Sequence, residues 1–236
     1  MEDLKSRIKE FALSEGADLV GIATARRFHG APNSHKPKDI LLEARTVIVC
    51  AKRVPNSVVM EGPGTSYQSV MTILYHELDL IAYKLAIHLQ QQGLAAIPVP
   101  SDDPYYDWNP DELHGRGDLS HKHAAQAAGL GRLGRNSLLI TPEFGNRVNL
   151  VSVVTNLDLE PDPLVEEELC PSKCILCVES CPVKAIGDDQ QVNQRACRSH
   201  SLVKLPKGQI IYSCRECRKV CPIGVAHSSQ TEGRGK

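Results

Sequence analysis

The chain has 236 residues, and its 27 Lys and Arg against 28 Asp and Glu leave a formal charge of −1. This balance excludes the polybasic tails that bind nucleic acids. A content of 42% apolar and 23% charged residues is typical of a globular protein with one large domain or two modest ones. The first ten residues are highly charged, and no apolar stretch approaches the length of a membrane span. We therefore expect a soluble, cytoplasmic protein without a membrane partner.

The first part of the chain predicts helices that alternate with strands. Apolar residues at helical spacing indicate a helix over residues 2–15, and the runs at 19–23 and 47–51 are typical of short buried strands. Cys50, in the second run, is interpreted as a small core residue. The intervening segments predict, in chain order, a loop, a short helix and an irregular stretch at 26–38, 39–44 and 53–65.

The longest helix is predicted over residues 67–92, which carry an apolar stripe and are followed by Gly93. A second helix is expected over 120–128, with Ser120 as its N-cap. Between them lies an aromatic loop at 104–110, which is either a lid packed on the core or a wall for a flat ligand. Further strands are predicted at 95–99, 137–140 and 148–155. The alternation over residues 1–160 indicates a layered α/β (α+β) domain.

Cysteine is the residue type that departs from an average composition. Eight of the nine cysteines lie near the C-terminal end, and only Cys50 lies elsewhere. A reducing compartment would not keep them as disulfides, so metal binding is the better account. From Cys170 onward the chain carries 11 Lys and Arg against 5 Asp and Glu, a net charge of +6, whereas residues 1–169 have −7. These opposite charges predict two modules that attract each other. The positive charge of the second part would also offset the negative charge of thiolate-ligated clusters.

The cysteine spacing is close to the C-x2-C-x2-C-x3-C-P run of two-cluster ferredoxins. One group ends at Cys181-Pro182 and the other at Cys221-Pro222. In that run the last cysteine of each group ligates the other cluster. The spacing therefore assigns Cys170, Cys174, Cys177 and Cys221 to cluster 1, and Cys181, Cys197, Cys214 and Cys217 to cluster 2.

The alternative is a pair of zinc sites, because C-x2-C knuckles also bind tetrahedral zinc. Two Cys-Pro endings that combine x2 and x3 spacings are more typical of [4Fe–4S] clusters. The sequence thus predicts a two-[4Fe–4S] ferredoxin-like domain over residues 164–226, followed by a flexible tail over 227–236.

Histidines are densest at His114, His121 and His123. His121 and His123 are two residues apart, so on a helix they point in different directions and cannot jointly chelate a metal. We interpret the group as solvent-facing or packing histidines. His121 or the nearby Asp118 is the weak candidate for a catalytic proton donor.

The glycines of Gly129-x-Gly131-x-x-Gly134 satisfy the spacing of the dinucleotide fingerprint. That fingerprint requires a strand before it and a helix after it, and here the predicted order is reversed. Two interpretations remain: a tight loop with glycine at positive φ, or a loop that approaches a bulky cofactor.

The segment from Ala127 to Ile140, A-A-G-L-G-R-L-G-R-N-S-L-L-I, resembles the A-G-L-G-x-x-G-K-N-x-L-L-I segment of the epoxyqueuosine reductase family. The cysteine order from Cys170 to Cys221 is also similar to that family and, more distantly, to the reductive dehalogenases. The resemblance implies a corrinoid-dependent iron–sulfur enzyme whose domain over 1–160 binds cobalamin beside cluster 1. The cofactor-binding residues that it implies are Gly129, Gly131, Arg132, Gly134, Arg135, Asn136 and Ser137.

Two family features are absent. The family's D-T-A-P-V-x-E-R stretch, which carries an acidic residue, is replaced by His114–His123, where Asp118 does not occupy the matching position. The chain stops fifteen residues after Cys221, whereas typical members continue into helical repeats that grip tRNA. A tRNA substrate is therefore doubtful.

The function predicted from the sequence is that of an oxidoreductase. Its two clusters would pass single electrons from a donor such as a flavodoxin or ferredoxin to a bound cofactor that reduces an unidentified small molecule. The alternative is a non-catalytic electron-transfer or maturation partner.

Overall fold

The computed structural model describes residues 2–187 and 191–224. Its centre is a four-stranded sheet in the order β1-β2-β8-β3, in which every neighbouring pair is antiparallel. The strands are β1 (Leu19–Thr24), β2 (Thr46–Arg53), β3 (Ala96–Val99) and β8 (Val148–Thr155). The predicted layered domain is thus a mixed α/β domain with an antiparallel sheet. The predicted tail over 227–236 lies outside the described residues.

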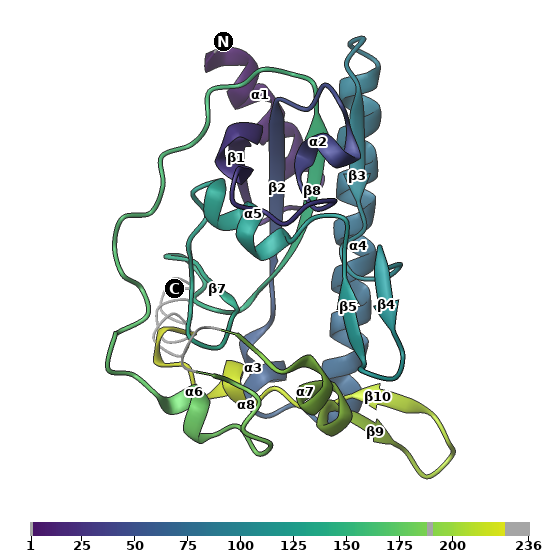
Figure 1. Cartoon of the computed structure of the whole chain (residues 1–236), viewed down its shortest axis with the longest axis vertical. Coiled ribbons are helices and arrows are strands. Elements are labelled where there is room, and N and C mark those ends of the chain that lie inside the picture. The colour runs from purple at the N-terminus through teal and green to yellow at the C-terminus, as the bar shows by residue number, and fades with distance from the viewer. Residues whose placement is uncertain (1, 188–190, 225–236) are drawn as a thin grey trace, which may run out of the picture.

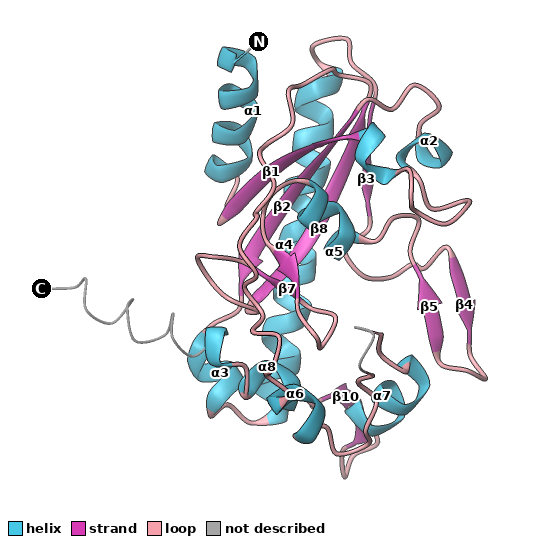
Figure 2. Ribbon diagram, turned by 60° about the vertical axis from the view of Figure 1, so that its left-hand side comes forward, coloured by secondary structure: helices cyan, strands magenta, loops and turns pink. Residues whose placement is uncertain are grey.

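Helices cover both faces of this sheet (Figure 2). α1 (Glu2–Ser14) and α4 (Gly64–Gln90) pack on one face, and α5 (His121–Ala127) packs on the other. Alternate residues of β2 serve the two layers: Ile48 and Cys50 face α4, whereas Val47 and Val49 face α5. Cys50 is fully buried, as predicted, and burial raises its pKa to about 12.

Several short elements differ from the sequence-based expectation. The helix expected at 39–44 is α2 (Pro37–Ile40), which begins earlier because Pro37 suits a first helical turn and the Asp39 carboxylate accepts from the Lys36 N–H at 2.9 Å. The predicted loops contain the remaining short elements: the 3₁₀ helix η1 (Ala25–Phe28), the helix α3 (Asn56–Met60) and the hairpin β4 (Asp107–Asn109) with β5 (His114–Arg116).

The Gly-rich hairpin, residues 129–140, follows α5 and pairs β6 (Arg132–Leu133) with β7 (Leu139–Ile140). We call residues 2–155 the sheet domain and residues 170–224 the cysteine module. The module consists of short elements at one end of the molecule (Figure 1). They are α6 (Leu176–Glu179), α7 (Gln194–Ser201), β9 (Leu202–Lys204), β10 (Ile210–Tyr212) and α8 (Glu216–Lys219).

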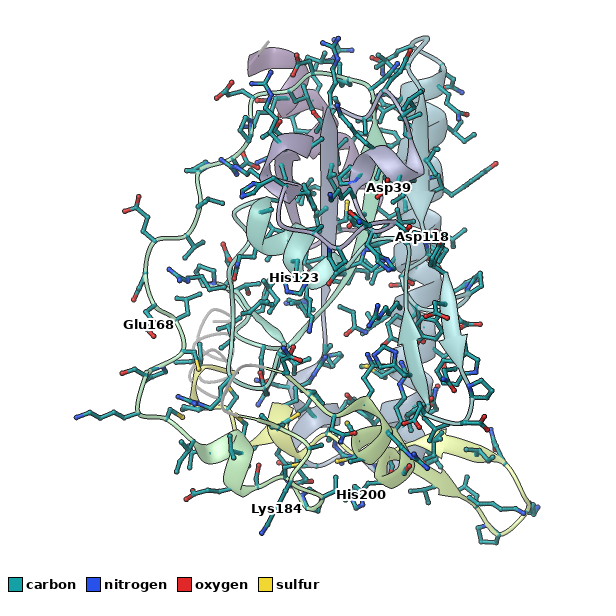
Figure 3. All side chains as sticks on the ribbon, viewed as in Figure 1. Asp39, Asp118, His123, Glu168, Lys184 and His200 are labelled. Carbon is teal, nitrogen blue, oxygen red and sulfur yellow. The ribbon has the colours of Figure 1, made fainter. Side chains whose placement is uncertain are left out.

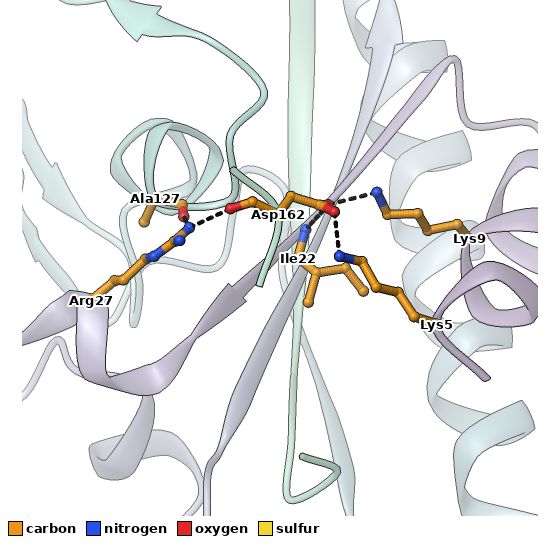
Figure 4. Close-up of polar contacts among 6 residues, drawn as sticks. All are labelled: Lys5, Lys9, Ile22, Arg27, Ala127 and Asp162. Atoms are coloured by element: carbon orange, nitrogen blue, oxygen red, sulfur yellow. Dashed lines mark hydrogen bonds and ion pairs between the residues drawn. The ribbon is translucent and has the colours of Figure 1, made fainter. Parts of the chain in front are cut away.

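An extended strap, residues 156–169, leads from the far end of the sheet along its side to the cysteine module (Figure 1). Asp162 anchors it: the carboxylate lies 2.7 Å from Lys5 Nζ and 2.6 Å from Lys9 Nζ, and accepts from the Ile22 N–H at 2.9 Å (Figure 4). Arg27 donates to the Asp162 carbonyl at 2.8 Å. These contacts fix the course of the strap before it reaches the first cysteine.

No helix among the described residues is long and apolar enough to cross a membrane.

Candidate metal centre

One small cavity of the cysteine module is lined by four cysteines from distant parts of the sequence: Cys170, Cys174, Cys177 and Cys221. α6 carries Cys177 and packs against α8, which ends just before Cys221. Cys177 interacts electrostatically with the other three thiols. Burial, followed by these neighbouring thiols, raises the pKa of Cys177. The structure therefore brings together the four residues assigned to cluster 1.

The remaining four cysteines form a second set. Cys197, on α7, interacts electrostatically with Cys181 and Cys214, and Cys217 interacts with Cys197 and Cys214. Burial raises the pKa of Cys197, and it raises that of Cys217 to about 12. These four residues are the ones assigned to cluster 2.

The two sets adjoin each other, because Cys217 of the second set also interacts electrostatically with Cys177 of the first. Backbone N–H groups point at the sulfur atoms: Ile223 and Gly224 donate to Cys221, and Ala185 donates to Cys181 Sγ at 3.2 Å. Such donors favour the thiolate form. The backbone around both sets is thus arranged for anionic sulfur.

All nine cysteines are free thiols. Among residues 2–187 and 191–224, no three His, Cys, Asp or Glu side chains are placed so that they could hold a single metal ion. Two adjoining sets of four thiols, each with N–H donors nearby, form a donor set that fits [4Fe–4S] clusters, which take four cysteine ligands each. The ligand assignment itself stays a prediction.

The three glycines of the Gly-rich hairpin are packed against the chain itself. A Cβ on Gly129 would lie 2.1 Å from the Pro163 carbonyl oxygen, one on Gly131 would lie 2.1 Å from the Ile140 carbonyl oxygen, and one on Gly134 would lie 2.7 Å from Ile140 Cδ1. Of the three, only Gly129 has a positive φ, +73°. Close packing against the Pro163 backbone and against the backbone and side chain of Ile140 accounts for these glycines without a cofactor.

The polar side chains of the same hairpin hold the parts of the chain that follow the sheet domain. Arg135 donates to the carbonyls of Cys174 at 3.1 Å and Ser172 at 2.8 Å, and Asn136 donates to that of Cys217 at 3.1 Å. Arg132 donates to the Glu166 carbonyl at 3.1 Å. Ser137 accepts from Lys122, and burial lowers the pKa of that lysine. Arg135 and Asn136, two of the residues predicted to contact a cofactor, thus connect the sheet domain to both cysteine sets.

The candidate proton donors lie elsewhere. His121 bonds through Nε2 to the Pro100 carbonyl at 2.8 Å and through Nδ1 to Ser152 Oγ at 2.9 Å, and burial lowers its pKa. The carbonyl requires a proton on Nε2, so in the neutral ring Nδ1 accepts from the serine. Asp118 precedes α5 and lies well away from the cysteine module (Figure 3). Neither side chain lines the cavity of the first cysteine set.

The other two histidines do not join His121. His114 is in β5, opposite Asn109. His123 is exposed on α5, where its Nδ1 lies 2.7 Å from Ser120 Oγ, so this predicted N-cap serine bonds to a side chain and makes no side-chain cap bond. This agrees with the interpretation of solvent-facing and packing histidines.

The aromatic segment over 104–110 contains β4, the first strand of the β4–β5 hairpin. This hairpin packs on α7 of the cysteine module. The Arg198 guanidinium lies 5.2 Å from the Tyr105 ring centre and 5.1 Å from that of Trp108, and the two rings stack at 5.6 Å. Gln194 exchanges two hydrogen bonds with the Gly115 backbone, at 3.1 and 3.2 Å. The hairpin therefore connects the sheet domain to the helix that carries Cys197.

Sequence reasoning missed the arginines around the cysteine sets. Arg215 donates to the Val59 carbonyl at 2.8 Å and also bonds to the Gly62 carbonyl. Arg147 and Arg218 are buried next to the thiols. The available signal was weak: Arg147 directly precedes a near-continuous apolar strand, where a charged residue is unexpected.

No protein-family model matches the chain. The chain is 28% identical over 257 residues to the epoxyqueuosine reductase of Bacillus subtilis (strain 168), covering 93% of this chain and 63% of the relative. It is 35% identical over 251 residues to that of Bacillus anthracis, covering 94% and 64%. A tetrachloroethene reductive dehalogenase of Dehalobacter restrictus (strain DSM 9455 / PER-K23) is 31% identical over 149 residues, covering 62% of this chain and 24% of the relative. The chain thus spans less than two thirds of the length of these relatives.

Solved structures with a similar fold come from the same two kinds of protein. A selenomethionine-labelled epoxyqueuosine reductase has a TM-score of 0.68 at 24% identity, covering 96% of this chain and 67% of that one. A reductive dehalogenase whose structure suggests a mechanism for B12-dependent dehalogenation has a TM-score of 0.67 at 24% identity, covering 91% and 31%. These likenesses concern the fold. The chain is homologous to the epoxyqueuosine reductases over most of its length and shares a fold with the reductive dehalogenases, as the sequence resemblance predicted.

Proposed function

We propose that the chain is an iron–sulfur oxidoreductase in which two [4Fe–4S] clusters pass electrons to a bound corrinoid, which reduces a substrate still to be identified. The grouping of eight cysteines into two adjoining sets of four carries the proposal. One-electron carriers placed side by side form a relay. Cys177 and Cys217 interact electrostatically across the two sets.

The corrinoid part of this proposal is based on the similar proteins, one of which is a reductive dehalogenase whose structure suggests a mechanism for B12-dependent dehalogenation. A corrinoid supplies low-valent cobalt chemistry, which amino-acid side chains do not offer. The Gly-rich hairpin borders two small cavities that also contain cysteines of the first set. A larger cavity, of about 820 Å³, is lined by residues of β1, α2 and the strap, away from the cysteine module. The homology, more than the hairpin, therefore supports the cofactor.

Metal analysis of protein purified without oxygen tests this proposal. We expect about eight iron and eight sulfide per chain, as two cubanes require. Cobalamin titration, followed by the visible spectrum and by calorimetry, should then show saturable binding. Stoichiometric zinc without sulfide would contradict the cluster proposal, and intact clusters without cobalamin binding would contradict the corrinoid.

The second candidate is an electron-transfer or maturation partner without an active site of its own. The bonding of His121 favours it, because both ring nitrogens are engaged and the ring is not free to deliver a proton to a substrate. The hydrogen bonds of Arg132, Arg135 and Asn136 to protein carbonyls favour it as well. A cluster-replete protein that exchanges electrons with a flavodoxin or ferredoxin, yet binds no cobalamin, would establish this second function.

A further inference from the structure

Two arginines are buried behind the cysteine sets without an acidic partner. Arg147, the residue before β8, is 2% exposed, and Arg218, on α8, is 8% exposed. Within the described part of the chain, neither guanidinium has a carboxylate within 4.0 Å. Arginine stays protonated in proteins, and a buried charge needs a counter-charge. The sheet domain does not supply one to either residue.

The hydrogen bonding of these side chains is also incomplete. Arg147 Nη2 lies 3.3 Å from the weak acceptor Met60 Sδ, and Arg147 Nε and Nη1 have no partner among the described residues. Both terminal nitrogens of Arg218 lie 3.4 Å from Asn149 Oδ1, at the long end of the hydrogen-bond range. Unmet donors on a buried charged group are costly. Anionic acceptors beside the thiols would satisfy the free donors of Arg147 and strengthen the weak bonding of Arg218.

Both guanidinium groups lie close to the thiols. A Cβ on Gly224 would lie 3.0 Å from Arg147 Nε, and the N–H of this glycine donates to Cys221. Arg147 interacts electrostatically with Cys221 and with Arg218. Arg218 directly follows Cys217 and interacts with its thiol. The two arginines thus lie one beside each cysteine set.

On the basis of the proposed two-cluster function, we infer that these arginines are the buried counter-charges of the clusters and raise their reduction potentials. Arg147 serves the cluster of the Cys221 set, and Arg218 serves the cluster of the Cys217 set. A cluster with four thiolate ligands is negatively charged, and its net charge helps to set its potential. Reduction adds a further negative charge, so a nearby cation stabilises the reduced form more than the oxidised form. Solvent and salt screen this effect little at a buried site.

The test uses the full chain with clusters, as the variants Arg147→Gln and Arg218→Gln. Iron and sulfide are measured first, and midpoint potentials then come from redox titration followed by paramagnetic resonance. We expect Arg147→Gln to lower the potential of the cluster of the Cys221 set more than that of the other cluster. Arg218→Gln should instead lower the potential of the cluster of the Cys217 set more. Arg195→Gln is the control, because it removes an exposed guanidinium, paired with Glu112 at 3.1 Å, from the same module. Its potentials should stay at the wild-type values.

Unchanged potentials in glutamine variants with full iron content would overturn the inference and leave the two-cluster function intact. Wild-type protein without clusters would overturn both. If the glutamine variants lose iron, Arg147→Lys and Arg218→Lys decide, because they keep the charge. Wild-type iron content with potentials near those of the wild type would support the counter-charge role, and loss of iron in these variants too would contradict it.

Discussion

Gly129 controls how closely the strap approaches the sheet domain. Its φ of +73° is unfavourable for other residues, and a Cβ there would meet the Pro163 carbonyl oxygen at 2.1 Å. Gly93 has a similar φ of +79° but open space around it. The pair separates the cost of backbone strain from the cost of a steric clash.

We therefore predict that Gly129→Ala destabilises the protein more than Gly93→Ala. The second variant should cost about 1–3 kcal/mol, the usual strain of a non-glycine residue in this conformation. The first should cost more, because the strap must also move away. Apparent melting temperatures of the cluster-containing proteins measure the difference. Equal shifts for both variants would show that the strap does not depend on this glycine.

Asp162 anchors the strap electrostatically. Burial acts to raise the pKa of its carboxyl group, but the hydrogen bonds and charges of Lys5 and Lys9 outweigh it and hold the pKa below its ordinary value. A carboxyl group whose pKa falls on folding stabilises the folded state above its ordinary pKa. That stabilisation is lost only as the pH falls through the lower, folded value.

Asp162→Asn should accordingly destabilise the protein by about 1–3 kcal/mol, as expected for hydrogen bonds to a charged group. The difference from the wild type should be constant from about pH 5 to 8, because the carboxyl group is ionised throughout that range. Urea unfolding at several pH values measures it. Asp158→Asn, at an exposed ion pair with Arg45, should change stability little. A difference that already shrinks between pH 8 and 6 would contradict the assigned pKa direction.

At the scale of elements, the β4–β5 hairpin connects the sheet domain to α7. Gln194 of α7 holds the hairpin by two hydrogen bonds to the Gly115 backbone. Gln194→Ala should release it, so that amide hydrogens of residues 105–116 exchange faster while those of β2 and β8 are unchanged. Hydrogen exchange followed by mass spectrometry measures this. Ser199→Ala, on the same helix and exposed, is the matched control, and equal acceleration in both variants would contradict a specific role for Gln194.

Element length decided what the sequence could predict. α1, α4, β2 and β8 extend over 8 to 27 residues, so their periodicity is visible in the sequence. The strands of the β4–β5 and β6–β7 hairpins have only two or three residues. The β4–β5 hairpin also depends on contacts with residues 79 positions away. Local patterns cannot show such contacts.

The candidate site likewise has a part that the sequence could predict and a part that it could not. Cysteine spacing reports the order of ligands along the chain, so the two sets could be proposed from the sequence. The roles of Arg147 and Asn136 depend on how the sheet domain meets the cysteine module, which no spacing records. The family resemblance identified the Gly-rich hairpin as important, but its contacts with the module were not foreseen.

At the scale of the whole molecule, hydrogen bonds to backbone carbonyls accompany the ion pair of Arg195 with Glu112, at 3.1 Å, across the boundary between the two parts. Arg135 and Asn136 of the sheet domain, and Arg215 of the cysteine module, donate to backbone carbonyls across the boundary. Charged donors on carbonyl acceptors make directional contacts that survive salt better than exposed ion pairs do. The boundary that surrounds the two thiol sets is therefore held by geometry as well as by charge.

Interleaving of the two cysteine groups would make the whole module depend on its last ligand. Cys221 lies near the end of the described chain, yet it joins the cavity formed by Cys170, Cys174 and Cys177. Cys221→Ala should damage the cluster of that set and leave the other cluster largely intact, because Cys181, Cys197, Cys214 and Cys217 are unchanged.

Paramagnetic resonance of the reduced protein, together with iron analysis, measures this outcome. Cys50→Ala is the control, since it removes a core thiol that belongs to neither set, and both signals should persist. The signal that survives in Cys221→Ala identifies the cluster of the Cys217 set. That cluster should then be the one whose potential responds more to Arg218→Gln than to Arg147→Gln. Suppose that Cys221→Ala instead abolished the signal of the cluster whose potential responds mainly to Arg218→Gln. Cys221 would then be a ligand of the cluster beside Arg218, and the assignment of Cys221 and Cys217 to different clusters would be wrong.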